Sequence, residues 1–299
     1  MGNRRLGTKR LEAVLDNLLG HVALNGVNGS PFVIKDPDRY YVEEYFTDGT
    51  PKLNATLLAA THDNAANCSA SRTVELAGNA AADGDAARAS TGGGVALSGG
   101  SNGDVAIVTG HLDSGQSALG GTDWGSETQL EFETIIRTKA NIDEMTILAG
   151  WIEASKVNNA APANFATHDE AVYFLFGHAD DTGTLATQAN LYVVLNHGAG
   201  NDVRVKLPIA VAASTSYRLG FTIDSDRKVS AWVNGVQYSL QGKTAAAEYT
   251  SAGAGTQKSG ALTNDKTFIP VVGIMQQAGN TRTIDCVYIK CSKLPYDNA

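Results

Sequence analysis

The clearest pattern of apolar and polar positions lies in residues 216–240, which read SYRLGFTIDSDRKVSAWVNGVQYSL. Its first part alternates apolar with polar or small residues, a period of two that is typical of a half-buried strand. The apolar positions are Leu219, Phe221 and Ile223. An Asp-Ser-Asp turn and a second alternating run follow, and Asn234-Gly235 then suits the two positive φ angles of a two-residue hairpin. The segment predicts an antiparallel meander of three strands.

Strand-like segments of this kind follow one another over residues 126–293. They are TQLEFETIIRT, MTILAGWIEA, EAVYFLFG, NLYVVLNHG, VRVKLPIA, the meander, FIPVVGIMQQ and RTIDCVYIKCSKL. Shorter strands are predicted at 95–97 and 105–108, in a region rich in Ala, Gly and Ser. Many short strands with turn signals between them are typical of two stacked antiparallel sheets. We expect a single all-β sandwich in which 155–168 and 241–267 are loops.

The alternation also assigns side chains to faces. Leu130, Phe132 and Ile136 fall on one face of their strand. We expect the following further side chains to be mostly buried: Phe174, Phe221, Ile223, Trp232 and Val233. Burial of large apolar side chains is the dominant favourable term in folding.

The first 60 residues differ from the rest, and we expect an arm at 1–60 ahead of a sandwich at 61–299. A short amphipathic helix is predicted at about 9–23, because its apolar residues share one helical face. They are Leu11, Val14, Leu15, Leu18, Leu19 and Val22. Acids interrupt this stretch, so it does not fit an export signal, and no apolar run is long enough for a membrane helix. The aromatic residues of the arm should pack on the main body or on a neighbouring subunit: Tyr40, Tyr41, Tyr45 and Phe46.

The formal net charge of −8 is unevenly distributed along the chain. The first ten residues hold Arg4, Arg5, Lys9 and Arg10 without an acid, which leaves −12 for the rest. An acidic body argues against nucleic acid as the main partner. Basic residues at the start of a helix oppose its dipole, so helix stability does not explain them. A solvated tail and an arm that docks on an acidic neighbour both stay open.

Three cysteines are present, and their spacing gives no disulfide framework. Cys286 and Cys291 should lie on one strand at an odd spacing, so we expect them on opposite faces and roughly 16 Å apart, too far to bridge. An odd number of cysteines without framework spacing favours reduced thiols in a cytoplasmic product. Buried small apolar side chains are the simplest role for them.

The meander, with its LGFTID and VSAWVNGVQ runs, resembles the concanavalin A-like, laminin-G-like jelly roll. That resemblance implies a two-sheet antiparallel jelly-roll sandwich, a fold that lectins, glycanases and virion proteins share. The basic start RRLGTKRL ahead of such a sandwich resembles structural proteins of tailed bacteriophages, of the capsid-decoration or fibre type. This second resemblance implies a non-enzymatic virion protein that is assembled in the bacterial cytoplasm. Its expected partners are further copies, with a trimer favoured, and the major capsid protein or other virion proteins. Neither nucleic acid nor a membrane is expected to bind.

Glycanases of this fold carry Glu-x-Asp-x-x-Glu on one strand, which directs the acids into one cleft. The nearest match is Glu131-Phe132-Glu133, which lacks the middle Asp and the third acid. Retaining catalysis also needs carboxyl groups about 5–5.5 Å apart. The sequence therefore favours a solvated strand face at this place, and a glycan hydrolase becomes the third of three functional hypotheses.

Metal and ligand candidates are few, and no cofactor is expected. His168-Asp169-Glu170 and His178-Ala179-Asp180-Asp181 lack zinc spacing. Solvated turns are the first interpretation, and a Ca²⁺ site involving Asp180 and Asp181 is the second. Asp224-Ser225-Asp226 lacks the later residues of a calcium loop and is predicted to be a hairpin turn.

The tryptophans separate the hypotheses further. Trp151 and Trp232 lie in predicted strands, where core packing is expected, whereas Trp124 follows a Gly-rich stretch and is the candidate exposed ring for stacking on a glycan. A glycan- or receptor-binding module of a fibre or spike is thus the alternative to a capsid-decoration protein. In the decoration hypothesis the anchoring residues are Arg4, Arg5, Lys9, Arg10, Leu11, Leu15, Leu18, Tyr40, Tyr41, Tyr45 and Phe46.

Overall fold

The structure of the protein is a computed structural model. It describes residues 39–46, 74–77, 84–89, 93–99, 105–110, 112–113, 116–117, 124–153, 170–177, 190–197, 203–238, 240, 261–276 and 281–294. Within these ranges the secondary structure consists of β-strands and turns, with no helix. No described segment is a helix of the length and apolar character needed to span a bilayer. The helix expected at about 9–23 lies outside the described residues.

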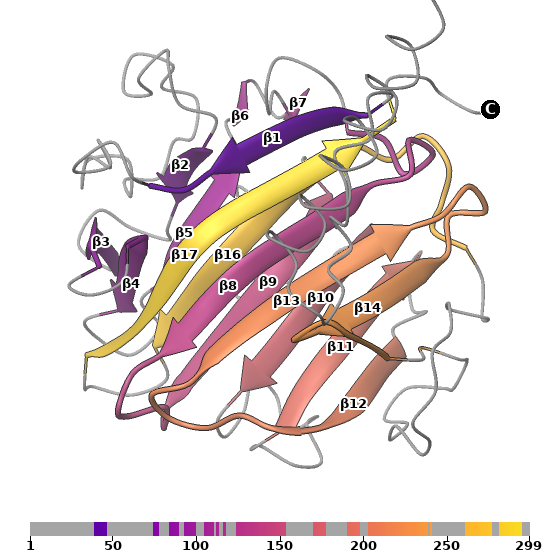
Figure 1. The fold of residues 1–299 in the computed structure, drawn as a ribbon. Coiled ribbons are helices and arrows are strands. Elements are labelled where there is room, and N and C mark those ends of the chain that lie inside the picture. Colours follow the sequence, from indigo (N-terminus) through magenta and orange to yellow (C-terminus); the bar gives the residue numbers. More distant parts are fainter. Residues whose placement is uncertain are drawn as a thin grey trace, which may run out of the picture.

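Two antiparallel sheets stack face to face (Figure 1). The front sheet has the strand order β15-β14-β13-β8-β17-β4-β3, and β1 pairs with β17 beside this path. Its strands are β15 (Val236–Tyr238), β14 (Val229–Val233), β13 (Ser216–Ile223), β8 (Glu131–Thr138), β17 (Arg282–Lys293), β4 (Val95–Gly99), β3 (Gly84–Arg88) and β1 (Tyr40–Glu44).

The back sheet lies behind it with the order β12-β11-β10-β9-β16-β5-β2. Its strands are β12 (Val203–Ala210), β11 (Asn190–His197), β10 (Glu170–Gly177), β9 (Met145–Glu153), β16 (Phe268–Gln276), β5 (Val105–Gly110) and β2 (Val74–Ala77). A separate short hairpin joins β6 (Leu112–Asp113) to β7 (Gln116–Ser117). The expected all-β, two-sheet sandwich is confirmed, and the strands predicted at 95–97 and 105–108 lie next to the edge strands β3 and β2.

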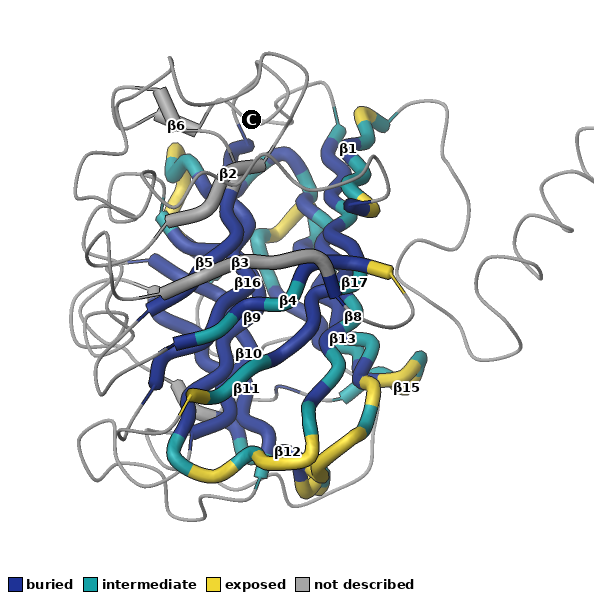
Figure 2. The backbone as a smooth tube through the Cα atoms, turned by 90° about the vertical axis from the view of Figure 1, so that its left-hand side faces the viewer, coloured by how far each residue is buried: buried dark blue, intermediate teal, exposed yellow. Residues whose placement is uncertain are grey.

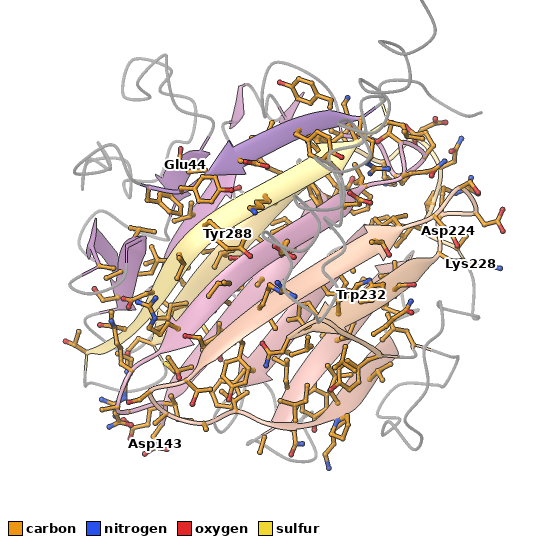
Figure 3. The ribbon with its side chains drawn as sticks, in the orientation of Figure 1. Glu44, Asp143, Asp224, Lys228, Trp232 and Tyr288 are labelled. Carbon is orange, nitrogen blue, oxygen red and sulfur yellow. The ribbon has the colours of Figure 1, made fainter. Side chains whose placement is uncertain are left out.

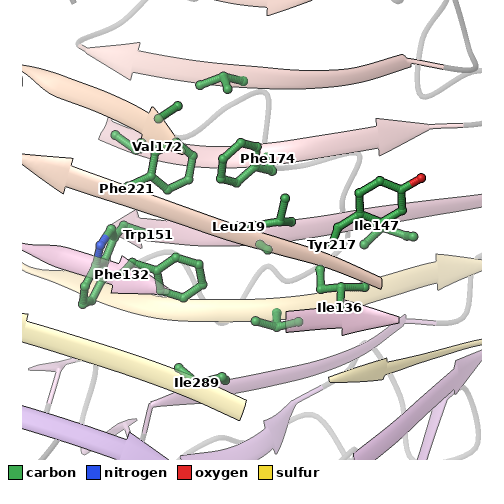
Figure 4. Close-up of a cluster of buried hydrophobic side chains, with 14 of the residues drawn as sticks. Phe132, Ile136, Ile147, Trp151, Val172, Phe174, Tyr217, Leu219, Phe221 and Ile289 are labelled. Atoms are coloured by element: carbon green, nitrogen blue, oxygen red, sulfur yellow. The ribbon is translucent and has the colours of Figure 1, made fainter. Parts of the chain in front are cut away.

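The main core fills the space between the sheets (Figure 4). Phe221 stacks on Phe174 at 4.3 Å between ring centroids and lies 6.5 Å from Phe132, so that rings from both sheets meet at the centre. Offset ring pairs of this kind add to the stabilisation from buried area. The predicted burial of Phe174, Phe221, Ile223 and Val233 is confirmed. Leu130, Phe132 and Ile136 also join this core, as their spacing predicts.

Trp232 is an exception to the predicted core. It is only partly buried, because the neighbouring Ala231 and Val233 both face the core. Successive side chains of a strand point to opposite faces, so Trp232 lies on the outer side of the front sheet. Trp232 is covered over most of its surface, but the expected packing in the core is wrong, because its side chain lies outside the main core. The alternation in the sequence contained the correct face.

The back sheet is apolar on both faces. A second cluster of buried side chains lies on the face directed away from the main core, and it includes Ile107, Leu148, Tyr173, Val194 and Ile269. Figure 2 shows these strands buried along almost their whole length. Strands that are buried on both faces read as continuous apolar runs. This explains why EAVYFLFG and FIPVVGIMQQ show no alternation.

The meander forms as predicted. Asn234 and Gly235 have φ angles of 51° and 82°, and Val233 faces Val236 across the two-residue turn. The Asn234 side chain also accepts a hydrogen bond of 2.9 Å from the Arg218 amide. At the other end of β14, Asp224 Oδ1 accepts hydrogen bonds of 2.9 Å from the amides of Asp226 and Lys228. This segment is the hairpin turn that the sequence predicts.

The two described cysteines lie on the same face of β17, which corrects the sequence analysis. A register shift between Cys286 and Tyr288 inserts an extra residue into the strand. Cys286 then faces Ile136 and Cys291 faces Phe132, and both thiols are free and belong to the main core. Because the facing positions on β8 are four residues apart, the thiols are still separated by about 13 Å along the strand, and they do not bridge.

Residues 40–44 lie in the front sheet, not in an arm ahead of it. They form β1, which pairs antiparallel with β17 from Tyr40↔Lys293 to Glu44↔Ile289. Val42 and Phe46 enter the main core, with exposed fractions of 8% and 3%. Residues 40–44 of the expected arm therefore form a strand of the sandwich, and residues 1–38 lie outside the described ranges.

Candidate functional site

A row of mostly polar positions crosses the outer front face, which we define as the side of the front sheet directed away from the core. The cross-strand register aligns Glu43 with Lys290, Lys290 with Glu133 and Glu133 with Gly220. The row continues from Gly220 to Trp232 and ends at Gln237. Figure 3 shows Tyr288 and Trp232 on the strands β17 and β14 of this sheet. This face contains Glu131 and Glu133, the nearest match to catalytic acids in the sequence.

Both candidate acids are held by neighbours in the same sheet. Glu131 accepts a hydrogen bond from the Ser292 hydroxyl and lies 3.4 Å from Arg39 Nε. Glu133 is only 2% exposed, and its Oε1 accepts a hydrogen bond of 2.6 Å from the Tyr288 hydroxyl. Arg218 Nε lies 4.0 Å from its other oxygen. Glu133 is therefore a buried structural partner and not the solvated residue that the sequence favours, whereas Glu131 is partly exposed.

Tyr288 and Lys290 connect this pair of acids to β1. Burial, followed by the negative charge of Glu133, raises the pKa of the Tyr288 phenol, so the hydroxyl keeps its proton and donates a hydrogen bond to the carboxylate. Lys290 Nζ lies 4.8 Å from the Tyr288 ring centroid and 5.3 Å from that of Tyr45. A cation over aromatic rings is stabilised by their negative faces. These contacts bind β1 and β17 together on the outer front face.

Trp124 is not the exposed platform that the sequence predicts. It is fully buried and lies 5.7 Å from Trp151 between ring centroids. Its backbone carbonyl accepts a hydrogen bond of 2.8 Å from the Phe268 amide, which fixes the segment that follows the Gly-rich stretch against β16. The partly buried Trp232 takes its place as the tryptophan of the outer front face, and no described residue bonds its buried Nε1.

A glycine lies beside Trp232 in this row. Gly220 faces both Glu133 and Trp232, is buried, and contributes no side chain at the middle of the row. Arg218 and Thr222 lie two residues before and two residues after Gly220 on the same strand, so they share the outer front face, and both are partly exposed. An aromatic ring with a guanidinium and a hydroxyl group on the same face is suited to contact a polar ligand that has an apolar side. The pattern LGFTI, with its one glycine at an outward position, could have indicated this missing side chain.

The remaining predicted site residues fall into two groups. Tyr40 and Tyr45 are 38% and 39% exposed, Tyr41 is partly buried and Phe46 lies in the core. The basic and apolar positions of the arm, and both calcium candidates, lie outside the described residues: Arg4, Arg5, Lys9, Arg10, Leu11, Leu15, Leu18, Asp180 and Asp181. Among the described residues no group of three acidic, His or Cys side chains could hold a metal ion.

Glu170, for which the sequence favours a solvated turn, is fully buried. Its carboxylate accepts hydrogen bonds from the Thr263 hydroxyl and from the Thr263 amide, the latter at 3.3 Å. Lys266 pairs in turn with Glu153 at 3.3 Å. These contacts fasten the segment before β16 to the end of the back sheet, so Glu170 has a structural role that its neighbours in sequence do not reveal.

One open cavity of about 350 Å³ lies at the end of β8, beside β4 and β17. It is lined by Ala96, Lys139, Ala140, Asn141, Thr281, Arg282 and Thr283. Its two cations are already paired, because Lys139 contacts the buried Asp285 and Arg282 Nη2 lies 2.9 Å from Glu144. The cavity therefore offers hydroxyl and amide groups without an uncompensated charge.

The described strands define a sandwich of two antiparallel sheets. The sequence matches no protein-family model and no curated protein. Among solved structures, a protein of unknown function from Shewanella oneidensis MR-1 superposes with a TM-score of 0.49 and 10% identity, over 85% of this chain and 86% of that one.

Two further similar structures carry sugar-related names. An alginate lyase from Pseudomonas aeruginosa has a TM-score of 0.44 and 11% identity, over 70% of this chain and 85% of that one. The carbohydrate recognition domain of Emp46p, in a potassium-bound form, has a TM-score of 0.43 and 6% identity, over 76% of this chain and 89% of that one. Likeness at this level concerns the fold alone, which many unrelated functions share.

Proposed function

We propose that this chain is a non-enzymatic structural protein of a tailed-bacteriophage virion. Its most specific form is a capsid-surface decoration protein, in which the first 38 residues anchor the sandwich to the capsid. The proposal combines the sequence resemblance with the geometry of the front sheet. It assigns binding and assembly to the protein and no chemical reaction. The expected partners are further copies of the chain and an acidic surface of the capsid.

The observation that carries the proposal is the attachment of β1. Arg39, Val42 and Phe46 fix residues 39–46 to the sandwich, through an ion pair with Glu131 and through the core. The preceding segment, with its four basic residues and its apolar spacing, is thereby joined to the body at a defined point of the front sheet. A load on that segment would be carried by strand pairing and buried side chains.

The engagement of both candidate acids gives independent support. Glu133 is paired with Tyr288, and Glu131 with Arg39 and Ser292. Catalytic acids must instead be able to reach a substrate bond. Wild type should therefore not cleave polysaccharides, and Glu131→Gln and Glu133→Gln should leave particle binding unchanged once the folded fraction is matched. Cleavage of a polysaccharide by wild type that either variant abolishes would refute the non-enzymatic assignment.

The anchor is tested by binding to particles that lack the protein. Full-length chain and a chain without residues 1–38 are mixed with such particles, and the bound fraction is measured by sedimentation. The full-length chain should bind, and binding should weaken as salt rises from 50 to 500 mM because screening reduces the attraction of exposed charges. The shortened chain should stay in solution. Equal binding by both chains would show that the sandwich itself makes the contact. The truncation must stop before Arg39, because removal of β1 would damage the front sheet.

A second candidate function is glycan binding on the outer front face. Trp232 and the partly exposed polar residues Arg218 and Thr222 of the same face favour it, because sugar rings offer one apolar side and many hydroxyl groups. The test is a glycan array probed with wild type and Trp232→Ala, with Tyr40→Ala as a matched control for an exposed aromatic residue. Loss of a glycan signal in Trp232→Ala alone would support this candidate, and the absence of any wild-type signal would exclude it for the glycans tested.

A further inference from the structure

We propose that the position of β1 on the front sheet is a strand-receiving site that accepts residues 39–46 from a second copy of this chain as well as from its own. Exchange of this strand would link neighbouring copies through contacts that already exist within one chain. The inference deepens the proposed assembly function, on which its biological meaning rests.

The contacts of β1 are concentrated in a short segment. Arg39 Nε donates a hydrogen bond of 2.9 Å to Ser292 Oγ, and its guanidinium also bonds the Gln129 carbonyl. Val42 and Phe46 are buried in the main core, and Phe46 holds a positive φ of 54° where its amide bonds Glu44. An eight-residue segment thus carries an ion pair, two buried anchors and a strand register. Such a segment can be recognised as a unit by main-chain pairing and side-chain pockets.

The receiving strand has an edge that must be covered. On one side, β17 pairs with β8 along most of its length. On the other side, β4 pairs with Arg282 to Cys286, and β1 pairs with the later part, from Ile289 to Lys293. Without β1 this part of β17 would expose unpaired backbone groups and the apolar cavities left by Val42 and Phe46. An exposed edge of this kind is a template for pairing with another chain.

The connection on the C-terminal side of β1 is long enough for exchange. Twenty-nine residues separate Glu44 from Val74, the first residue of β2. A chain of that length can span roughly 100 Å, which exceeds the diameter of about 50 Å expected for a compact chain of this size. The same strand can therefore reach its own body or that of a neighbour, with identical contacts in both cases. The local concentration of neighbouring chains then determines whether the strand binds its own body or that of a neighbour. The free-energy difference is small, because the exchanged strand makes identical contacts.

Cys291 provides a direct chemical test, because it faces Val42 across the β1–β17 pair. Directly facing residues have Cβ atoms about 4.5–5.5 Å apart, close to what a disulfide spans. All chains carry Cys68→Ser and Cys286→Ala. The donor chain carries Val42→Cys with Cys291→Ala, and the receiver chain keeps Val42 and Cys291 and bears a size tag. The two chains are co-expressed, purified, oxidised and resolved by non-reducing electrophoresis.

We expect a disulfide-linked heterodimer of donor and receiver. It should be at least tenfold more abundant than the heterodimer formed by a control donor that carries Tyr41→Cys and Cys291→Ala in place of Val42→Cys and Cys291→Ala. Tyr41 alternates with Val42 and faces Ser292, so its cysteine should not reach Cys291. A single chain that carries Val42→Cys and keeps Cys291 measures whether the disulfide forms within one chain. A chain with Tyr41→Cys and Ser292→Cys repeats this measurement at the neighbouring facing pair. Closure within one chain without any heterodimer would overturn the proposal. Failure of both pairs to close within one chain would overturn it as well, because β1 would then not occupy this site.

The result is independent of particle binding. A heterodimer in purified protein supports strand exchange even if the chain without residues 1–38 still binds particles. A chain that needs residues 1–38 for binding but forms no heterodimer would retain the proposed function and lose the exchange.

Discussion

Single side chains of the front sheet take their roles from the face on which alternation places them. Phe221 and Trp232 lie on neighbouring strands and face opposite sides of the sheet. The first is fully buried against rings of both sheets, and the second lies partly buried on the outer front face. The same rule makes Glu133, which follows the buried Phe132, an outward residue that nearby side chains then cover.

Phe221→Ala should lower the free energy of unfolding by about 3–5 kcal/mol, the usual cost of removing a core Phe and leaving a cavity. The loss should be large because Phe174 and Phe132 both contact the ring. Tyr40→Ala, at a residue that is 38% exposed, is the control and should cost far less. Urea denaturation measures both variants. A loss below about 1 kcal/mol for Phe221→Ala would mean that the ring does not fill the core.

Alkaline pH should destabilise the fold through its buried thiols. Burial raises the pKa of Cys286 from its ordinary value of 9.0 to about 12, despite a side-chain hydrogen bond with Thr134 that lowers it. Burial also raises the pKa of Cys291. A proton that is held more tightly in the folded chain stabilises it fully below pH 9, and this stabilisation is lost as pH rises from 9 to 12.

Each buried thiol should then contribute a loss of about 1.4 kcal/mol per pH unit above pH 9. Urea denaturation of wild type and Cys286→Ala at pH 8, 9.5 and 11 measures this dependence. The variant should be less stable at pH 8 but should lose less stability with rising pH. Parallel losses in both proteins would show that Cys286 does not titrate in this range.

At the level of strands, the register shift in β17 determines which residues enter the core. It brings Cys286 and Cys291 to one face and leaves Tyr288 outward beside Glu133. Gly94 lies against this irregularity, with a φ of 96° and no room for a Cβ, which would lie 2.3 Å from the Cys286 carbonyl oxygen. Bulges re-aim side chains in this manner and are built features of a sheet.

Gly94→Ala should therefore destabilise the protein by more than 2 kcal/mol, combining strain at positive φ with a backbone clash. Gly93→Ala is a matched control, because its φ of 77° is similarly strained while a Cβ there meets nothing within 4 Å. It should cost about 1 kcal/mol, the strain of the left-handed conformation alone. Thermal and urea unfolding compare the two variants. Equal losses would indicate that β17 has no fixed irregularity beside Gly94.

These elements also show how far sequence reasoning extends. Local alternation and turn chemistry were sufficient for the meander, because Asn234-Gly235 and the period of two act within a few residues. The bulge in β17 depends on contacts with β4 and β8, which are distant in sequence, so RTIDCVYIKCSKL alone predicts opposite faces for the cysteines. The sequence misassigns Trp124 for a related reason, since residues distant in sequence cover it: its segment bonds β16, and Tyr40 and Trp151 lie against its ring. The engaged acids required knowledge of which residues face them across strands.

For the whole molecule, the central claim is that this sandwich serves assembly and that residues 1–38 carry its attachment. The most direct measurement is quantitative mass spectrometry of purified phage particles, with the ratio of this chain to the major capsid protein as the readout. Particles are produced with either the full-length chain or the chain without residues 1–38 as the sole source. The account predicts a fixed ratio of full-length chain that survives repeated purification, and loss of the shortened chain to the soluble fraction although it remains folded. A full-length chain that is found only in the soluble lysate, or a shortened chain present at the full-length ratio, would contradict it.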